Sequence, residues 1–227
     1  MRPSAIVLVS GGLDSATALG WATTQFQHIL PVNIYYGQRH SKETFAAEQL
    51  CDHYGLASPL HLDFSQPFAM IGGSSLTSGS IHGNPSQELV ERTPSDLPPT
   101  FVPGRNMVFL AAVAGLGYVH RIYDIVGGWN AVDYSGYPDC RPEFFAAAER
   151  ALGEALVHPL TIHTPLISLT KQEIIELGTK LDVPYRLTWS CYSGGGAPCG
   201  QCDSCVIRRD GFAAAKLPDP ALTAATS

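Results

Sequence analysis

The chain has 227 residues, 45% of them hydrophobic and 15% charged, which suits one domain with a sizeable core or one domain with a small appendage. Its formal net charge of −6 argues against a protein that grips many nucleic-acid phosphates, and it favours a small-molecule substrate. No apolar stretch reaches membrane-spanning length and Met1–Ser4 leads directly into a strand-like run, so we expect a soluble, cytoplasmic protein without a signal peptide.

The first predicted elements are a buried strand and a helix joined by a glycine-rich turn. Ala5–Val9 is a short apolar run rich in β-branched residues, and Ala16–Ala22 has a helical composition. The turn between them reads Ser10-Gly11-Gly12-Leu13-Asp14-Ser15. In this arrangement backbone N–H groups and the positive end of a helix dipole point at one spot, and the glycines let an anion approach closely. We therefore predict a phosphate-binding loop.

The spacing of this motif narrows the kind of phosphate site. It is neither a Walker loop nor the dinucleotide-binding Gly-x-Gly-x-x-Gly pattern. It resembles the pyrophosphate-binding loop of the ATP pyrophosphatase superfamily, whose members cleave ATP to AMP and pyrophosphate and pass the AMP to an acceptor oxygen. A packing turn without a ligand is the alternative, but the turn is longer and more polar than packing needs.

Strands alternate with helices through the rest of the chain. The pattern predicts strands at 28–36, 59–63, 122–126 and 160–164, and helices at 41–53, 107–119, 143–156 and 170–177. A capping box, Thr170 to Glu173, starts the last of these helices. The alternation predicts a doubly wound, mostly parallel α/β sheet with its ligands at the carboxyl ends of the strands. A short helix and a weakly ordered tail at 217–227 complete the expected fold.

Residues 67–100 are rich in glycine, serine and proline and lack hydrophobic periodicity. Long loops inside compact domains are usually functional or disordered, so this segment can be a lid near the site or a solvated insertion. We predict an ATP-binding α/β domain at 1–185 that carries this flexible insertion, followed by a zinc-binding helical lobe and tail at 186–227.

A polar loop follows the predicted strand at 122–126 and therefore lies on the same rim as the phosphate loop. It holds three kinds of group that recognise a planar polar ligand: aromatic faces, carboxylates that accept adjacent N–H groups, and a guanidinium that pairs with a carboxylate. These groups are Trp129, Tyr134 and Tyr137; Asp133 and Asp139; and Arg141. A polar surface loop with structural aromatics is the alternative, but the position at a strand end favours substrate binding.

Two other segments carry arginine side chains that can contact phosphate. Arg105 can be a solvated surface charge or can reach the ATP phosphates, and Asn106 can be the N-cap of the following helix. Arg39 can contact phosphate, whereas we expect His40 to be structural.

Four of the six cysteines crowd into one C-terminal segment, as Cys191, Cys199, Cys202 and Cys205. Four thiolates close the coordination sphere of a tetrahedral metal, so we favour structural zinc over an iron–sulfur cluster or free thiols. Cys51 fits an ordinary core position. Cys140 lies in the polar rim loop, where a catalytic thiol is conceivable, but no paired base is evident and an inert neighbour is favoured.

Taken together, these segments resemble the 7-cyano-7-deazaguanine synthase family of queuosine biosynthesis over nearly the whole chain. The resemblance rests on Ser10–Ser15, Tyr36–His40, Val102–Asn106, Asn130–Arg141 and Trp189–Tyr192 with the cysteine cluster. It implies an adenine nucleotide alpha hydrolase-like, Rossmann-like fold and a carbon–nitrogen ligase. It also implies ATP with Mg²⁺, one structural Zn²⁺ per subunit, and a homodimer without direct nucleic-acid or membrane contact.

The resemblance implies a reaction in which ATP converts the carboxylate of 7-carboxy-7-deazaguanine to an acyl adenylate, ammonia gives an amide, and a second activation followed by elimination gives the nitrile. ATP is then expected to bind Val9, Ser10, Gly11, Gly12, Leu13, Asp14, Ser15, Ala16 and Arg39. Catalytic roles are expected for Asp14, Ser15 and Arg105. Substrate contacts are expected for Asp133, Tyr134, Tyr137, Asp139 and Arg141, and zinc ligation for the four clustered cysteines.

Two rival functions come from other classes. A tRNA-modifying relative is expected to show a basic surface and, if it transfers sulfur, a catalytic cysteine pair, which the net charge and the single rim cysteine argue against. A non-enzymatic, zinc-bearing nucleotide-binding module would not need both the phosphate loop and the second polar rim loop.

Overall fold

The computed structural model describes residues 3–37, 42–74, 97, 100–132, 137–192 and 196–223. Its centre is one five-stranded sheet in the order β3-β2-β1-β4-β5, in which every neighbouring pair is parallel. The strands are β1 Ser4–Leu8, β2 His28–Tyr35, β3 Leu60–Asp63, β4 Asp124–Val126 and β5 Thr161–His163. The chain winds outward from β1 through β2 and β3, then crosses to β4 and β5, which confirms the doubly wound prediction.

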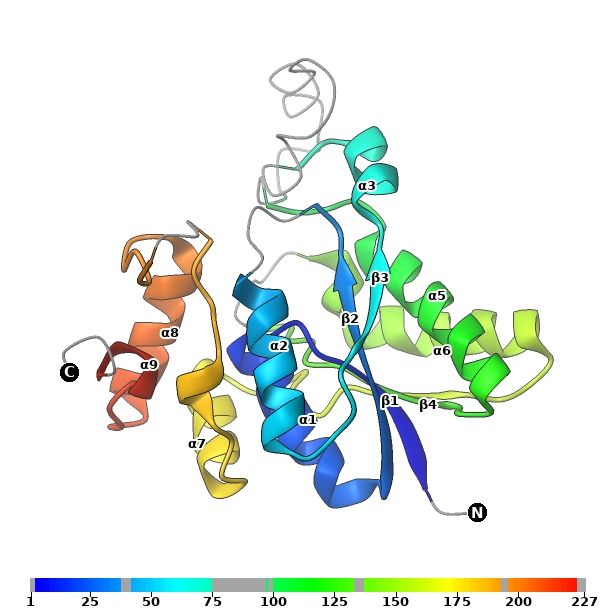
Figure 1. Ribbon diagram of the computed structural model, residues 1–227. Helices are drawn as coiled ribbons and strands as arrows, with labels where there is room; N and C mark the ends of the chain where they lie inside the picture. Colours follow the sequence, from blue (N-terminus) through cyan, green and yellow to red (C-terminus); the bar gives the residue numbers. More distant parts are fainter. Residues whose placement is uncertain are drawn as a thin grey trace.

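Helices cover both faces of this sheet (Figure 1). One face carries α1 Leu13–Gln25, α2 Lys42–His53 and α7 Lys171–Lys180, and the other carries α5 Arg105–His120 and α6 Pro142–Leu156. The side chains of β1 alternate between the two cores because successive strand residues point to opposite faces, so Ala5 and Val7 pack with α1 whereas Ile6 packs with α5.

Several boundaries differ from those predicted. The helix α1 begins at Leu13 because three residues of the phosphate loop form its first turn, and α5 begins at Arg105. The helix α3 Ser65–Ile71 was not predicted: it is short, and Phe68 is its one fully buried side chain. Residues 75–96, 98 and 99 of the predicted insertion lie outside the described residues.

The C-terminal segment is more ordered than the composition of 217–227 predicts. The helix α8 Asp203–Ala214 is followed by a short helix, α9 Pro220–Thr223. Arg208 of α8 is buried and forms a two-point ion pair with Asp219, with N···O distances of 2.7 and 2.9 Å. The prediction of a weakly ordered tail is therefore wrong at Asp219, because a buried guanidinium requires a carboxylate partner.

The strand order also places the functional rim. From β1 the chain continues to β2 on one side of the sheet, and from β4 it continues to β5 on the other side. A doubly wound sheet opens a crevice at the carboxyl ends of two such neighbouring strands. Both polar loops singled out in the sequence follow these two strands. Among the described residues, none of the helices is long and apolar enough to cross a membrane.

Candidate active site and cysteine cluster

The phosphate loop is shaped by its own hydroxyl groups. Ser15 Oγ donates to the carbonyl of Gly12 at 3.0 Å and accepts a hydrogen bond from the backbone N–H of Ser10 at 3.2 Å. Ser10 Oγ donates to Ser15 Oγ at 3.0 Å. Gly12 is the N-cap of α1 and makes no side-chain capping bond. The N-terminal turn of α1 therefore keeps backbone N–H groups that an anion can bind.

Two glycines bring neighbouring segments onto this loop. Gly11 has φ +92°, and a β-carbon on it would lie within 2.1 Å of the Glu43 carbonyl oxygen at the start of α2. A β-carbon on Gly128, which follows β4, would lie 2.7 Å from the carbonyl of Asp14. The rim loop after β4 thus packs directly on the first turn of α1, as the shared-rim prediction requires.

A cleft of about 340 Å³ opens at the carboxyl ends of the strands. The phosphate loop forms one part of its wall, through Ser10, Gly12, Leu13, Asp14 and Ser15. Aromatic side chains form another part, namely Tyr36, Phe109, Trp129, Tyr137, Trp189 and Tyr192. The cleft therefore joins an anion-binding loop to surfaces on which a planar ring can stack.

Arg105 lies in this cleft and is not a solvated surface charge. Its Nη1 donates to the hydroxyl of Tyr36 at 3.4 Å, and its guanidinium carbon lies 5.4 Å from the centre of the Tyr36 ring. Burial raises the pKa of Tyr36, although the guanidinium opposes this shift, so the phenol stays neutral at ordinary pH. The cleft thus contains a cation beside aromatic rings.

Asn106 does not cap α5, because Gly104, with φ +71°, is the N-cap. Instead the Asn106 amide donates to the backbone carbonyl of Asp139 at 2.8 Å and accepts a hydrogen bond from Trp129 Nε1 at 3.3 Å. The backbone N–H of Asn106 donates to Asp139 Oδ2 at 3.2 Å. The buried Asp139 carboxylate therefore completes the N-terminus of α5 from outside the helix.

Cys140 lines the cleft as a neutral thiol. Burial, reinforced by the nearby Asp139 carboxylate, raises the pKa of its thiol to about 11. The amide of Asn106 lies 3.5 Å from its Sγ, and an amide is not a base. A thiol that stays protonated near neutral pH is a poor nucleophile, which favours the inert alternative.

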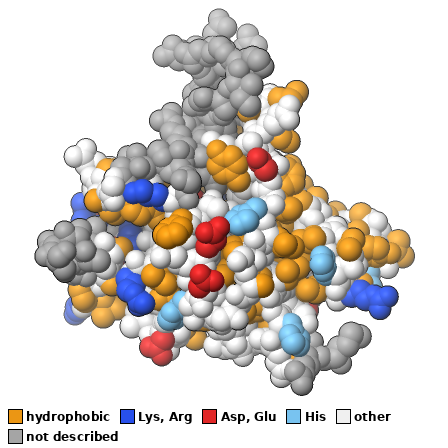
Figure 2. Space-filling view, in the orientation of Figure 1, with side chains coloured by type: hydrophobic (Ala, Val, Ile, Leu, Met, Phe, Trp, Pro, Cys, Tyr) orange, Lys and Arg blue, Asp and Glu red, His pale blue; other side chains and the backbone are white. Residues whose placement is uncertain are grey.

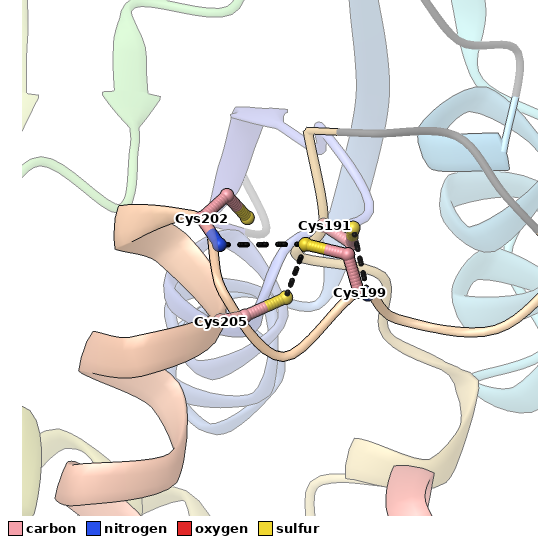
Figure 3. A group of neighbouring side chains, drawn as sticks. All are labelled: Cys191, Cys199, Cys202 and Cys205. Carbon is pink, nitrogen blue, oxygen red and sulfur yellow. Dashed lines mark hydrogen bonds between the residues drawn. The ribbon is translucent and has the colours of Figure 1, made fainter.

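The four clustered cysteines meet at the start of α8. The Sγ atoms of Cys191, Cys199, Cys202 and Cys205 all lie within 4.8 Å of one another, and in Figure 3 the side chains converge on a common point. Sulfurs bound to one zinc at about 2.3 Å lie roughly 3.8 Å apart. The arrangement can therefore bind a metal such as zinc.

The surroundings of these sulfurs also suit a metal-bound thiolate. Backbone N–H groups of Gln201 and Cys202 approach Cys199 Sγ at 3.5 and 3.4 Å, and the N–H of Cys199 approaches Cys191 Sγ at 3.3 Å. Such donors stabilise negative sulfur. Burial raises the pKa of the Cys205 thiol, and a bound cation would take the place of its proton.

Comparison with known proteins decides the family. Residues 4–216 match the family described as "QueC: Queuosine biosynthesis protein QueC". The chain belongs to the QueC family. Proteins named 7-cyano-7-deazaguanine synthase resemble it along almost their whole length. The one from Thermoplasma acidophilum is 45% identical over 224 residues, covering 96% of this chain and 91% of that protein. The one from Oceanobacillus iheyensis is 44% identical, covering 95% of this chain and 96% of that protein. The one from Dechloromonas aromatica is 45% identical, covering 98% of this chain and 99% of that protein.

The fold is also that of a solved structure described as a 4-thiouridine synthetase–RNA complex with bound ATP. That structure has a TM-score of 0.50 and 15% sequence identity, and the match covers 93% of this chain and 53% of that one. At this identity the likeness supports the fold alone. It agrees with the predicted adenine nucleotide alpha hydrolase-like architecture of this QueC family member.

The structure brings together only part of the predicted site. Nine predicted residues line the cleft: Val9, Ser10, Gly12, Leu13, Asp14, Ser15, Arg105, Trp129 and Tyr137. Gly11 and Ala16 support the loop from behind, with Ala16 fully buried. Asp139 caps α5, and Arg141 is exposed at the N-cap of α6, away from the cleft lining. Arg39, His40, Asp133 and Tyr134 lie outside the described residues.

Sequence reasoning missed Lys171 as a site residue. Its Nζ lies 2.5 Å from Asp14 Oδ1, and it lines the cleft from the first turn of α7. The capping box that places it was predicted and is present, with Thr170 Oγ1 accepting from the N–H of Glu173. The available signal was a lysine directly after the N-cap of a helix that follows a rim strand.

Sequence reasoning also missed the contribution of the C-terminal segment to the cleft. The backbone N–H of Trp189 donates to the carbonyl of Gly11 at 2.9 Å, and Lys42 Nζ lies 4.3 Å from the centre of a Trp189 ring. Ser190, Ser204 and Arg208 line the cleft as well. The segment that carries the cysteines therefore forms part of the cleft wall in this QueC family protein.

Proposed function

We propose that this protein is an ATP-dependent carbon–nitrogen ligase that converts 7-carboxy-7-deazaguanine and ammonia to 7-cyano-7-deazaguanine in queuosine biosynthesis. The observation that carries the proposal is the single cleft in which the phosphate loop faces aromatic side chains and Arg105. Membership of the QueC family and the activity named for its relatives support this choice of reaction.

We assign the ATP phosphates to the N-terminal turn of α1. The backbone N–H groups there are donors that are already held in place before the nucleotide arrives, because the hydrogen bond from Ser10 Oγ to Ser15 Oγ shapes the loop. Arg105 adds a cation within the cleft. We keep Arg39 as a further phosphate contact on the strength of the family motif.

We assign the planar acceptor to the aromatic part of the cleft. Tyr36, Phe109 and Tyr137 offer ring faces there, and Tyr137 shares a hydrogen bond of 2.5 Å with Thr100 Oγ1. We keep Asp133, Tyr134 and Arg141 as candidate substrate contacts from the family motif. The carboxylate of Asp139 is instead buried against the N-terminus of α5, which supports a role in positioning that helix.

The proposed chemistry is two successive adenylations. A carboxylate oxygen attacks the α-phosphorus of ATP and pyrophosphate leaves. Ammonia attacks the acyl carbon, AMP leaves with that oxygen, and loss of a proton gives the amide. The amide oxygen then attacks the α-phosphorus of a second ATP and a second pyrophosphate leaves. Loss of AMP, which carries that oxygen away, and of the two N–H protons gives the nitrile. No step needs a nucleophilic side chain, which agrees with the neutral Cys140 thiol.

Two metals accompany this proposal. Mg²⁺ neutralises part of the triphosphate charge when it binds with ATP, and Asp14 is the carboxylate that the phosphate loop offers it. One zinc per chain suits the four cysteines, because four protein sulfurs leave no open position for substrate or water. We therefore assign zinc a structural role in a lobe spanning 186–227, beside an ATP-binding domain at 1–185 with its insertion at 67–100.

The formal net charge of −6 supports a small-molecule substrate over nucleic acid, because a protein that binds many nucleic-acid phosphates usually carries a basic excess. On the face drawn in Figure 2, acidic side chains lie nearer the centre and most Lys and Arg side chains lie on the left of the view. We further propose a cytoplasmic homodimer, for which light scattering of the purified protein is the test.

The test is a turnover assay with purified, metal-replete protein. It is incubated with ATP, Mg²⁺, ammonium and 7-carboxy-7-deazaguanine, and mass spectrometry follows the amide, the nitrile and AMP. The expected result is transient amide, then nitrile, with two AMP released per nitrile. The variant Ser15→Ala, which removes the hydroxyl at the centre of the loop network, is expected to slow both steps. If metal-replete protein forms neither nitrile nor AMP when Mg²⁺ and ammonium are supplied, the proposal is overturned.

A further inference from the structure

Lys171 reaches the phosphate loop from the start of α7. Its Nζ is 2.5 Å from Asp14 Oδ1, and only 13% of its side chain is exposed. A lysine ammonium is a compact point charge that suits phosphate oxygens. Because the ammonium lies beside the loop and lines the cleft, it is close to the place where the phosphates of ATP are expected.

The aliphatic stem of Lys171 lies directly against the backbone of α8. A β-carbon on Gly211 would be 2.4 Å from Lys171 Cγ and 2.9 Å from Ile175 Cδ1. Both distances are shorter than carbon atoms tolerate without movement. Gly211 is buried within the C-terminal half of α8, so only the absence of a side chain there allows Lys171 its present position.

The same C-terminal lobe also touches the phosphate loop itself. Arg208 of α8 donates to Thr188 Oγ1 at 2.7 Å and to Ser190 Oγ at 3.2 Å, and so fixes the strip of chain between them. Between these two residues, the backbone N–H of Trp189 donates to the carbonyl of Gly11. The helix that supports Lys171 and the backbone bonded to the loop therefore belong to one packed unit.

We propose that the C-terminal lobe positions Lys171 to bind the phosphates of ATP, and that Gly211 is the positioning residue that sets the place of its ammonium. An Asp14 carboxylate without a cation would repel an incoming triphosphate, and the ammonium offsets this repulsion. The inference rests on the proposed function, since it takes ATP as the ligand. It goes beyond it by assigning the cysteine-bearing lobe a part in nucleotide binding.

The first test compares two glycine-to-alanine substitutions within helices. Gly211→Ala in α8 moves Lys171, whereas Gly115→Ala in α5 places its β-carbon where nothing lies within 4 Å. Alanine favours a helix over glycine in both, so neither change weakens helix formation itself. We expect Gly211→Ala to raise the KM for ATP at least about fivefold with an unchanged KM for the carboxylate substrate, since a misplaced charge loses part of a charged hydrogen bond. Gly115→Ala is expected to match the wild type.

The second test is a double-mutant cycle. Lys171→Ala is expected to lower kcat/KM for ATP by roughly 10- to 100-fold, the range for a hydrogen bond to a charged group. In that background Gly211→Ala is expected to add less than about a twofold effect, because the Lys171 Cγ that it displaces is gone. Thermal unfolding and metal content are measured for every variant, so that a folding defect is distinguished from misplacement.

Three results would overturn the inference. They are wild-type kinetics for Lys171→Ala, kinetics of Gly211→Ala equal to those of Gly115→Ala, and fully additive effects in the double variant. Failure of the proposed function is distinct, because the wild type would then form no nitrile. In that case calorimetric titration with ATP and Mg²⁺ still compares the affinities of the same variants.

Discussion

Gly11 shows how a single residue can be required by its surroundings and not only by its own backbone angle. Its φ of +92° is one that other residues rarely adopt, and its missing side chain leaves room for the Glu43 carbonyl oxygen. Gly55 also has a positive φ, +64°, but a β-carbon there would meet nothing within 4 Å. Substitution of Gly55 therefore tests backbone strain alone, whereas substitution of Gly11 also tests the close contact with the start of α2.

We expect Gly11→Ala to reduce ATP-dependent turnover by about 100-fold or more, because displacement of the phosphate loop by even 1 Å costs about that much. Gly55→Ala is expected to cost only about 1 kcal/mol of stability, from left-handed strain, with kinetics near those of the wild type. AMP release and urea unfolding measure the two effects. Comparable kinetic losses in both variants would show that the contact with Glu43 is unimportant.

Cys140 provides a second residue-scale prediction, through its pKa. Burial raises that pKa from 9.0 to about 11, so the thiol is protonated below this pH and the reactive thiolate appears only as the pH rises through it. We expect Cys140 to resist iodoacetamide at about pH 8, where an ordinary exposed thiol reacts. Peptide mass spectrometry after timed alkylation measures this.

Cys140→Ala is expected to retain more than about a tenth of the wild-type kcat, since the proposed reaction forms no covalent bond to sulfur. A loss of more than about 100-fold in folded protein would assign the thiol a chemical role.

At the scale of elements, α8 illustrates a helix held in place by one buried ion pair. The side chains of Arg208 and Asp219 are only 9% and 5% exposed, and Arg208 also donates to the carbonyl of Tyr185 at 3.2 Å. One residue further along the helix, Arg209 pairs with Asp210 at the surface, where both side chains are more than half exposed. The helix thus offers a buried and an exposed ion pair side by side.

We expect Asp219→Ala to destabilise the protein by about 3–5 kcal/mol, because it leaves the buried Arg208 guanidinium without its carboxylate. The control Asp210→Ala removes an exposed partner and is expected to change stability by less than about 1 kcal/mol. Urea unfolding of both variants gives the comparison. Equal stability losses would mean that burial does not distinguish the two pairs.

The helices and strands were largely predictable because their signals are local. The apolar run before the phosphate loop, the period of α6 and the capping box of α7 are each contained within a few neighbouring residues. The helix α3 escaped prediction because a seven-residue segment gives too little periodicity. The ordered backbone around Asp219 was not predicted, because it depends on an ion pair with Arg208, eleven residues earlier in the chain.

Across the whole molecule, the predictable part of the site is the part encoded in continuous motifs. The phosphate loop and the four cysteines could be found from spacing alone. Lys171 could not, because its contact with Asp14 joins residues 157 positions apart. The sequence predicts Asp139 as a substrate contact, but in the structure its carboxylate is buried against the N-terminus of α5. Such roles depend on packing between elements, which no local pattern carries.

The contact between the cysteine-bearing lobe and the phosphate loop leads to a prediction for metal removal. Chelation is expected to remove one metal per chain and to expose four additional thiols to a thiol reagent, since four sulfurs converge at the start of α8. Loss of a bound metal is expected to free the segment before α8, which includes Trp189 and the hydrogen bond from its backbone N–H to the Gly11 carbonyl.

Hydrogen exchange should therefore increase first in α8 and next in the phosphate loop, whereas β1 and β4 stay protected. Elemental analysis, thiol titration and exchange measured by mass spectrometry test this together. Cys202→Ser is expected to reproduce the effect of chelation, because it removes one of the four ligands. The matched control is Cys51→Ser in the buried face of α2, which is expected to lower stability without changing metal content. Unchanged exchange in α8 after complete metal removal would contradict a structural metal, since the lobe would then hold its fold through packing alone.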